Sequence, residues 1–341
     1  MKTYKLLLLL SIIGISLSVK AEKDSTSVEP KPTHKVFANI YTGAFHNLGT
    51  KKPNAGFELS TALFGYKFQY SDDLKFTLIY DVTRTTNGIT VKDTMGNNLP
   101  VYYFEGSKYT AFLKMAEIKW YFHDKFSLSA GQLLNQQYLT VQDKVWGHRY
   151  VLTTMQELFR MAMPADFGMR VEYKDKETFA LSLGANNGNG PFRHQDTLST
   201  IEYTSNLEIY LVKNLLIKTY IGLTPSTFET EKDLKTAFSG FLAYQKPKYT
   251  IGAEYSYTNN VAFKNFHYSG FSTFTYYNIT DKFEIFARYD YVDKSPVISY
   301  ENVYVGGFQY KPKKNLYLSI NYRYWEKSEV QQIYFNLGAR F

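Results

Sequence analysis

The sequence of 341 residues has no cysteine, only 10 prolines and a mean hydropathy of −0.33. The missing cysteine excludes disulfide scaffolds, thiolate metal sites, cysteine nucleophiles and lipid attachment through an N-terminal cysteine. Repeated apolar runs of about 20 residues, which a polytopic helical membrane protein needs, are also lacking. Aromatic residues are abundant instead, with 31 tyrosines and 26 phenylalanines in a chain that is 44% hydrophobic. This composition argues against disorder and indicates a large folded body rich in β-favouring side chains.

The one long apolar run lies at the N-terminus and has the form of a secretory signal. Two lysines precede the apolar residues 6–19, and Val19-Lys20-Ala21 forms a small-x-small cleavage site. A single membrane anchor is the alternative, but the run is too short and lacks a charged stop on its far side. We therefore predict a signal peptide over residues 1–21 and a flexible periplasmic tether over residues 22–34.

The net charge of the exported chain is small. Removal of residues 1–21 leaves 36 basic and 31 acidic residues, so the net charge falls from +8 to +5. That surplus gives no reason to expect a nucleic-acid partner.

Residues 35–341 are predicted to form one domain built from short strands. Apolar and polar residues alternate along them, as Ile285 and Ala287 do with Glu284 and Arg288, and amphipathic helix is nearly absent. The segments are about ten residues long, enough to cross a bilayer as tilted strands. The alternation has no clear phase in 266–279 and 301–310. The sixteen predicted strands are 35–46, 55–70, 74–86, 109–123, 126–134, 166–174, 177–185, 199–212, 215–224, 235–245, 249–258, 266–279, 283–292, 301–310, 315–325 and 332–341.

Two kinds of connection alternate between these strands, and their order predicts a transmembrane antiparallel β-barrel. Seven tight turns rich in Asp, Lys, Asn or Pro alternate with eight looser loops, as in outer-membrane barrels with short periplasmic turns and longer external loops. Closure pairs every backbone group, which hydrocarbon demands. The last strand ends on Phe341, which resembles the assembly signal of bacterial outer-membrane barrels. A water-soluble β-sandwich is the alternative fold, and fourteen or eighteen strands are the alternative counts.

A barrel of roughly sixteen strands encloses a water-filled lumen, so function depends on what narrows it. The longest loop, 135–165, is predicted to fold inward as a constriction. A basic cluster in a narrow passage favours anions by focusing the local field. The alternative is that its charges only solvate an external loop. The predicted constriction residues are Lys144, His148, Arg149 and Arg160, together with the acidic Glu157.

Elsewhere the inward-facing charges are of mixed sign, so any anion preference is expected to be weak. Many of them can pair across strands and stiffen the wall. Aromatic residues near the strand ends, such as Trp120 and Tyr255, are predicted to form girdles facing the outer-membrane lipids. The predicted lumen wall includes Glu117, Lys119, Arg170, Arg288 and Arg323.

Residues 131–190 resemble the central stretch of the phosphate-selective porin O/P type and related porins of Bacteroidota. The matching positions are Gly131-Gln132 at a strand end, Pro164 through Gly168 at the entry into the next strand, and Asn187-Gly188 after the following hairpin. The resemblance implies a sixteen-stranded channel, usually a homotrimer, that passes small anions or other small hydrophilic solutes. The chain departs from it by lacking a dense ladder of arginine and lysine.

Other function classes leave weaker signals in the sequence. The six histidines are scattered, and we find no GxSxG, HExxH or phosphate-loop motif, which argues against an enzyme and a metal site. A hydrophobic-substrate transporter usually carries an N-terminal plug, for which residues 22–34 are short. A structural barrel bound to a partner remains an alternative. We predict a channel in the outer membrane of a Gram-negative bacterium for passive diffusion of small hydrophilic solutes, weakly anion-preferring and without a cofactor.

Overall fold

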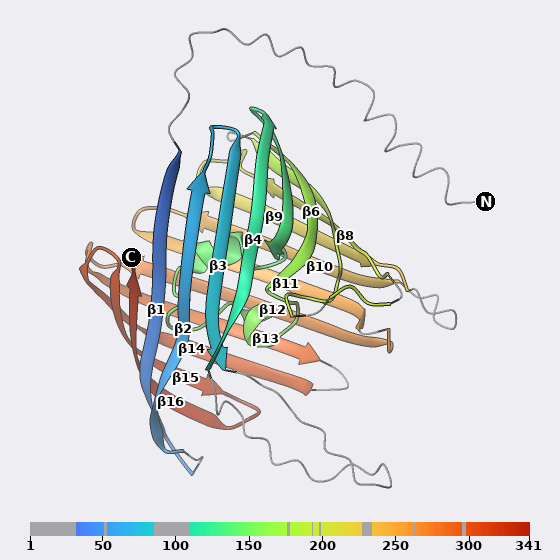
Figure 1. Ribbon diagram of the computed structural model, residues 1–341. Helices are drawn as coiled ribbons and strands as arrows, with labels where there is room; N and C mark the ends of the chain where they lie inside the picture. Colours follow the sequence, from blue (N-terminus) through green and yellow to red (C-terminus); the bar gives the residue numbers. More distant parts are fainter. Residues whose placement is uncertain are drawn as a thin grey trace, which may run out of the picture. The chain divides into compact units, whose positions relative to one another are not determined.

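The computed structural model describes residues 32–50, 53–84, 109–175, 178–192, 194–197, 199–226, 234–261, 263–294 and 298–341. These residues form a closed antiparallel β-barrel in which each strand pairs with its neighbours in sequence and β1 pairs with β16 (Figure 1). The predicted signal peptide and most of the predicted tether lie outside the described residues.

The barrel has the sixteen strands that the sequence predicts, and most of their ends agree within two residues. β1 begins two residues before its predicted start at residue 35, within the predicted tether, while β8 is shorter than predicted and β14 is longer. The strands are β1 Thr33–Asn47, β2 Ala55–Gln69, β3 Leu74–Arg84, β4 Tyr109–His123, β5 Phe126–Leu134, β6 Ala165–Lys174, β7 Phe179–Asn186, β8 Glu202–Ile209, β9 Leu215–Thr224, β10 Lys235–Gln245, β11 Tyr249–Val261, β12 Phe266–Asn278, β13 Phe283–Lys294, β14 Ile298–Lys313, β15 Leu316–Trp325 and β16 Val330–Arg340.

The seven tight connections meet at one end of the barrel. Asn214 and Asn315 sit in two of them with φ of 68° and 66°, a left-handed conformation that asparagine tolerates better than most residues. The other end carries the remaining connections, including residues 135–164 between β5 and β6. This arrangement confirms the predicted antiparallel barrel.

The outer face of the barrel is apolar. Among the described residues, no helix has the length and apolar character needed to cross a membrane. Large apolar side chains are exposed on strands all around the barrel wall, whereas soluble monomers rarely expose extended apolar patches. Since every strand also has two pairing neighbours, this surface suits hydrocarbon. The belt includes Ile118, Met169, Leu183, Ile221, Leu242, Ile251, Phe271, Ile320 and Phe335.

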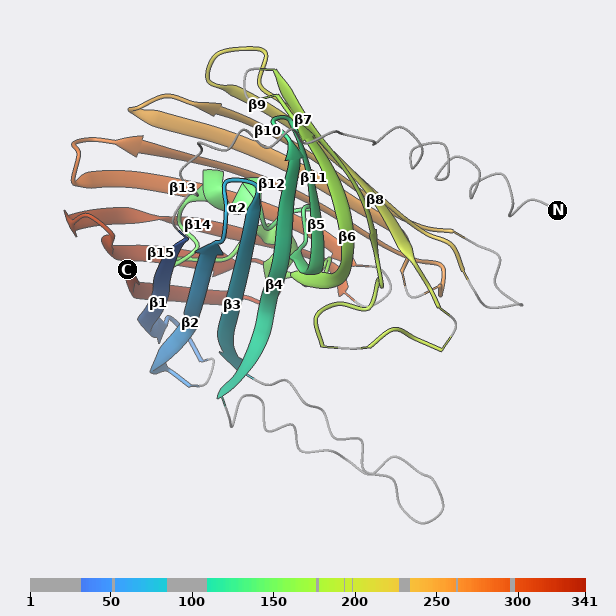
Figure 2. The same ribbon diagram turned by 45° about the horizontal axis from the view of Figure 1, so that its top comes forward.

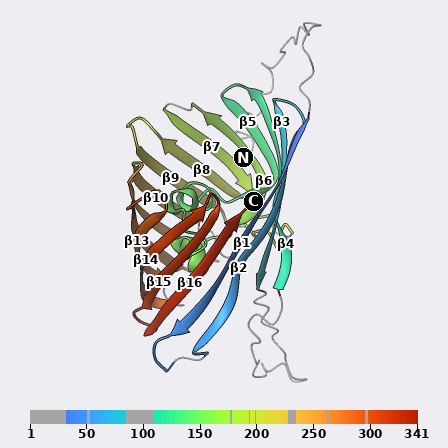
Figure 3. The same cartoon turned by 90° about the vertical axis from the view of Figure 1, so that its left-hand side faces the viewer.

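Residues 135–164, called the inner segment below, lie inside the barrel. They contain two short helices, α2 (Val141–Trp146) and α3 (Met155–Leu158). Figure 2 shows α2 within the ring of strands, and Figure 3 shows the helical turns nearer to β10 and β13 than to β1 and β3. The segment packs on the wall in an apolar cluster of Val145, Trp146, Tyr150, Val151, Leu152, Met155, Phe159 and Met161 against Tyr41, Leu216, Phe241, Ala243, Phe274, Phe286, Val292, Val303 and Val305.

Candidate functional site

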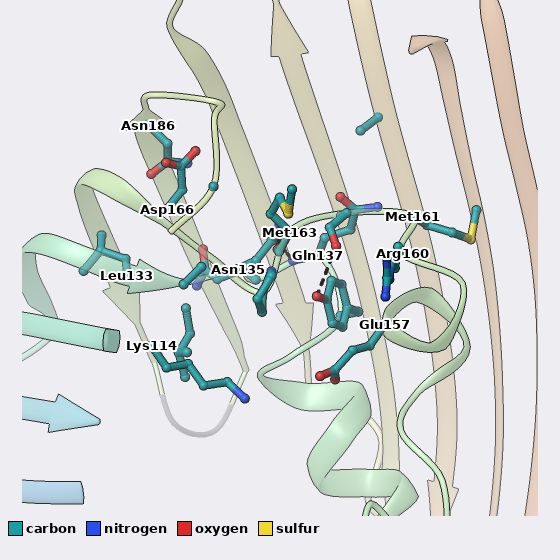
Figure 4. A pocket seen from close by; sticks show the side chains of 18 of the residues that line it. Lys114, Leu133, Asn135, Gln137, Glu157, Arg160, Met161, Met163, Asp166 and Asn186 are labelled. Atoms are coloured by element: carbon teal, nitrogen blue, oxygen red, sulfur yellow. Dashed lines mark hydrogen bonds between the residues drawn. The ribbon is translucent and has the colours of Figure 1, made fainter. Parts of the chain in front are cut away.

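A cavity of about 960 Å³, called the main cavity below, lies between the inner segment and strands β2–β12 (Figure 4). A water molecule takes up about 30 Å³ of liquid, so this space holds water together with a small solute. Five basic and four acidic side chains line it, an almost balanced set. They are Lys114, Arg149, Arg160, Arg170 and Lys235 with Asp81, Glu157, Asp166 and Glu202.

Within the inner segment, Arg149 is held by two carboxylates. Its Nη1 lies 3.0 Å from Asp143 Oδ1, and its Nη1 and Nη2 each lie 2.5 Å from an oxygen of Glu157. Burial raises the pKa of the Glu157 carboxyl, but the charge and hydrogen bonds of Arg149 outweigh it and hold this pKa below its ordinary value. The pair therefore stabilises the fold at neutral pH, and this contribution is lost only as the pH falls through that lowered pKa.

The five predicted constriction residues do not form one cluster. Arg149, Glu157 and Arg160 line the main cavity, whereas His148 lines a second cavity and Lys144 lines neither of the two. Arg160 and Lys144 are exposed, and no described carboxylate forms an ion pair with Arg160. The positive charge of Arg149 is offset by its partners, so Arg160 is the member that presents an uncompensated charge to the main cavity.

Lys114 faces the main cavity although the strand alternation does not place it there. β4 has a register shift, since Ile79 pairs with Met115 while Tyr80 pairs with Leu113. The extra residue is Lys114, and this bulge turns it inward beside Met115. Its Nζ lies 2.6 Å from Asp81 Oδ2. Figure 4 shows Lys114 and Glu157 pointing toward each other across the cavity.

Three of the predicted lumen-wall residues form ion pairs between strands of the inner face. Lys119 Nζ lies 3.0 Å from Glu172 Oε1, and Arg170 Nη2 lies 3.5 Å from Glu117 Oε1. Such pairs cancel charge along the wall and leave no continuous stripe of one sign.

The other two predicted wall residues, Arg288 and Arg323, also point inward but are covered by the inner segment. Arg288 pairs with Asp290 at 2.6 Å and donates to the Thr153 carbonyl at 2.6 Å. Arg323 Nη2 donates to the Val151 carbonyl at 2.6 Å. They therefore contact the inner segment instead of open lumen.

Lys218 on β9 makes a similar contact with the inner segment, which the sequence pattern did not predict. Its ammonium donates to the carbonyls of Gln136 and Gln137, the second at 3.2 Å, and to Gln142 Oε1 at 2.6 Å. Alternation places it on the inner face, but only the folded structure brings the glutamine-rich start of the inner segment to it.

The second cavity, of about 400 Å³, opens at the end of the barrel with the tight turns and is lined by His148, Glu284 and Lys311. His148 Nδ1 lies 2.6 Å from the Trp146 carbonyl, and its Nε2 bonds the Glu284 carboxylate. Lys311 Nζ lies 2.9 Å from the same carboxylate. His148 therefore fastens the inner segment and lies away from the main cavity.

No group of three or more His, Asp or Glu side chains suited to a metal ion occurs in the part of the chain that the structure describes. The predicted absence of a cofactor and of enzymatic activity stays a prediction.

Comparison with known proteins finds the same architecture in porins. No protein-family model and no curated protein matches the sequence. OprB of Pseudomonas putida is similar in structure, with 11% identity, a TM-score of 0.64, and coverage of 90% of this chain and 94% of that chain. The anion-selective porin of Comamonas acidovorans gives 10% identity, a TM-score of 0.61, and coverage of 91% of this chain and 99% of that chain.

A third neighbour is a trimer. The in-vitro folded trimer form of OmpT, an outer membrane protein of Vibrio cholerae, gives 11% identity, a TM-score of 0.57, and coverage of 92% of this chain and 99% of that chain. At these identities the likeness concerns the fold. The chain thus has the fold of the outer-membrane porins of Gram-negative bacteria, which confirms the predicted fold class and agrees with the predicted location.

Proposed function

We propose that the chain is a channel of the Gram-negative outer membrane that lets small hydrophilic solutes diffuse passively through its lumen. The observation that carries this proposal is the main cavity, a charged space of about 960 Å³ inside a closed barrel with an apolar outer face. The inner segment bounds that space on one side and sets its width. This is the role that the sequence pattern suggests for loop 135–165.

The charges of the main cavity support weak selectivity. Five basic and four acidic side chains line it, and most of them are paired. Among the described residues neither Arg160 nor the acidic Asp166 of this lining forms an ion pair, and the basic side chains outnumber the acidic ones by one, so we infer a slight preference for anions. The resemblance to phosphate-selective porins stays a prediction, because the three structural neighbours described above are not named as phosphate-selective.

Reconstitution in planar bilayers tests the proposal. The refolded protein should give large, persistent ohmic steps, and a KCl gradient should give a reversal potential slightly on the anion-selective side. Heat-denatured protein at the same concentration serves as the control. A folded, heat-modifiable barrel that gives no steps would contradict the proposal and favour a plugged transporter or a structural barrel.

We propose further that the channel is a homotrimer. The support is the trimer form of the structurally similar OmpT and the broad apolar outer face, part of which a partner subunit can cover. Unheated protein in mild detergent should have three times the polypeptide mass by light scattering, corrected for bound detergent. A mass equal to one chain under the conditions that give conductance steps would contradict the trimer.

A further inference from the structure

The inner segment is packed against the wall as closely as the interior of a soluble domain. Trp146 and Met155 are 1% and 0% exposed. The Trp146 ring lies edge-on to two wall rings, with centroids 5.2 Å from Phe274 and 6.2 Å from Phe286. The packing around Trp146 and Met155 therefore excludes water, whereas the opposite face of the segment borders the main cavity.

Two glycines of the wall leave room for this close approach. A Cβ on Gly338 of β16 would lie 2.9 Å from Cβ and Cγ of Tyr150, and one on Gly270 of β12 would lie 2.6 Å from Sδ of Met155. Side chains at these positions would push the segment off the wall. The lack of a side chain at these two glycines thus lets the segment approach the wall closely at two separate positions.

Five cations of the wall bind the backbone of the segment. Lys294 and Arg340 are half-buried and donate to the carbonyls of Phe159 (2.8 Å) and Gly147 (3.4 Å), and the other three are buried. Lys218 donates to two carbonyls and one side-chain amide at the start of the segment, while Arg323 and Arg288 donate to the carbonyls of Val151 and Thr153. Within the described residues neither Lys218 nor Arg323 forms an ion pair, and their exposed fractions are 1% and 4%. A buried charge needs hydrogen-bond acceptors. The segment supplies those of Lys218, whereas Arg323 donates to the Val151 carbonyl and also to Asn321 and Asn336 of the wall.

The position of these donors explains which way the segment faces. Because its carbonyls are engaged by the wall, its charged residues Arg149, Glu157 and Arg160 turn toward the main cavity. The apolar packing attracts the segment to the wall but does little to fix its orientation. The directional hydrogen bonds from the wall cations fix which residues of the segment face which strands.

We propose that Lys218, Arg288 and Arg323 are positioning residues that hold the inner segment permanently against the β9–β16 wall. The space left for solutes is then the main cavity along strands β2–β12, and its width does not change by movement of this segment. The conductance test of this inference rests on the proposed channel function. Its hydrogen-exchange test rests only on the docking of the segment against the wall.

The conductance test uses Lys218→Met, Arg323→Met and their combination. The doubly substituted channel should conduct at least about twofold more than wild type with added current noise, because a released segment no longer narrows the lumen. Lys218→Arg should restore wild-type conductance and low noise. Lys75→Met is the matched control, since Lys75 on β3 lies over the ring of Tyr121 on β4 and lines neither cavity. Wild-type conductance and noise in the double variant would overturn the proposal.

Hydrogen exchange on the wild-type protein tests the same proposal without a variant. Amides of residues 141–159 should exchange as slowly as those of β9–β14, because the docked segment opens no more often than the wall. Complete exchange of these amides while the wall stays protected would overturn permanent docking. Absence of conductance steps in wild type would defeat the channel function alone, since slow exchange would still support docking.

Discussion

Replacing Trp146 with alanine should lower the free energy of unfolding by about 3–5 kcal/mol, the usual cost of removing a large aromatic side chain from a packed interior. The side chain is 1% exposed and its Nε1 donates to the Leu152 carbonyl at 2.8 Å. The variant therefore loses both apolar burial and a hydrogen bond that closes the turn after α2. Guanidinium unfolding in detergent, followed by circular dichroism, measures the change.

Trp120→Ala is the matched control for this substitution. Trp120 lies on the outer face of β4 and is 48% exposed, so its loss leaves no internal cavity. We expect a cost of about 1 kcal/mol or less for it. Equal costs for the two substitutions would show that the inner segment adds nothing to the stability of the barrel.

Replacing Arg160 with glutamate should make the channel cation-selective. The lining of the main cavity would change from five basic and four acidic side chains to four basic and five acidic ones. One unit charge about 4 Å from a permeating ion is worth about 1 kcal/mol even at the dielectric constant of water, or about fivefold in relative permeability. The reversal potential in a KCl gradient measures the effect, and its sign should invert.

Lys144→Glu makes the same charge change in the same segment and serves as the comparison. Lys144 is exposed and lines neither cavity, so its substitution should move the reversal potential much less. Equal shifts for both variants would mean that the whole segment, and not Arg160, sets the field in the pore.

The strands could be predicted from the sequence because lipid-facing side chains are apolar and lumen-facing side chains are polar, so the two kinds alternate along each strand. The alternation is weaker where lumen-facing side chains are packed against the inner segment and are apolar as well. Phe274 on β12 and Val303 and Val305 on β14 point inward and pack on the inner segment. These strands are apolar on both faces, which explains why the phase of 266–279 and 301–310 is unclear in the sequence.

The constriction could be predicted only in part, because side-chain partners far apart in sequence decide it. Loop 135–165 does lie inside the barrel, yet its charges do not act together. Asp143 and Glu157 offset Arg149, while Glu284 of β13 binds His148 away from the main cavity. Lys114 is itself the bulged residue of β4, and period-two alternation cannot locate a bulge.

The one-sided packing inside the barrel has a mechanical consequence. Strands β9, β10 and β12–β14 are braced from within by an apolar cluster of low compressibility, whereas the described residues of β2–β8 contribute nothing to that cluster and line the main cavity. Lateral pressure from the surrounding lipids should therefore leave the braced arc nearly round and flatten the opposite arc. Because the main cavity borders that softer arc, the area open to solutes should respond to membrane tension even while the inner segment stays fixed.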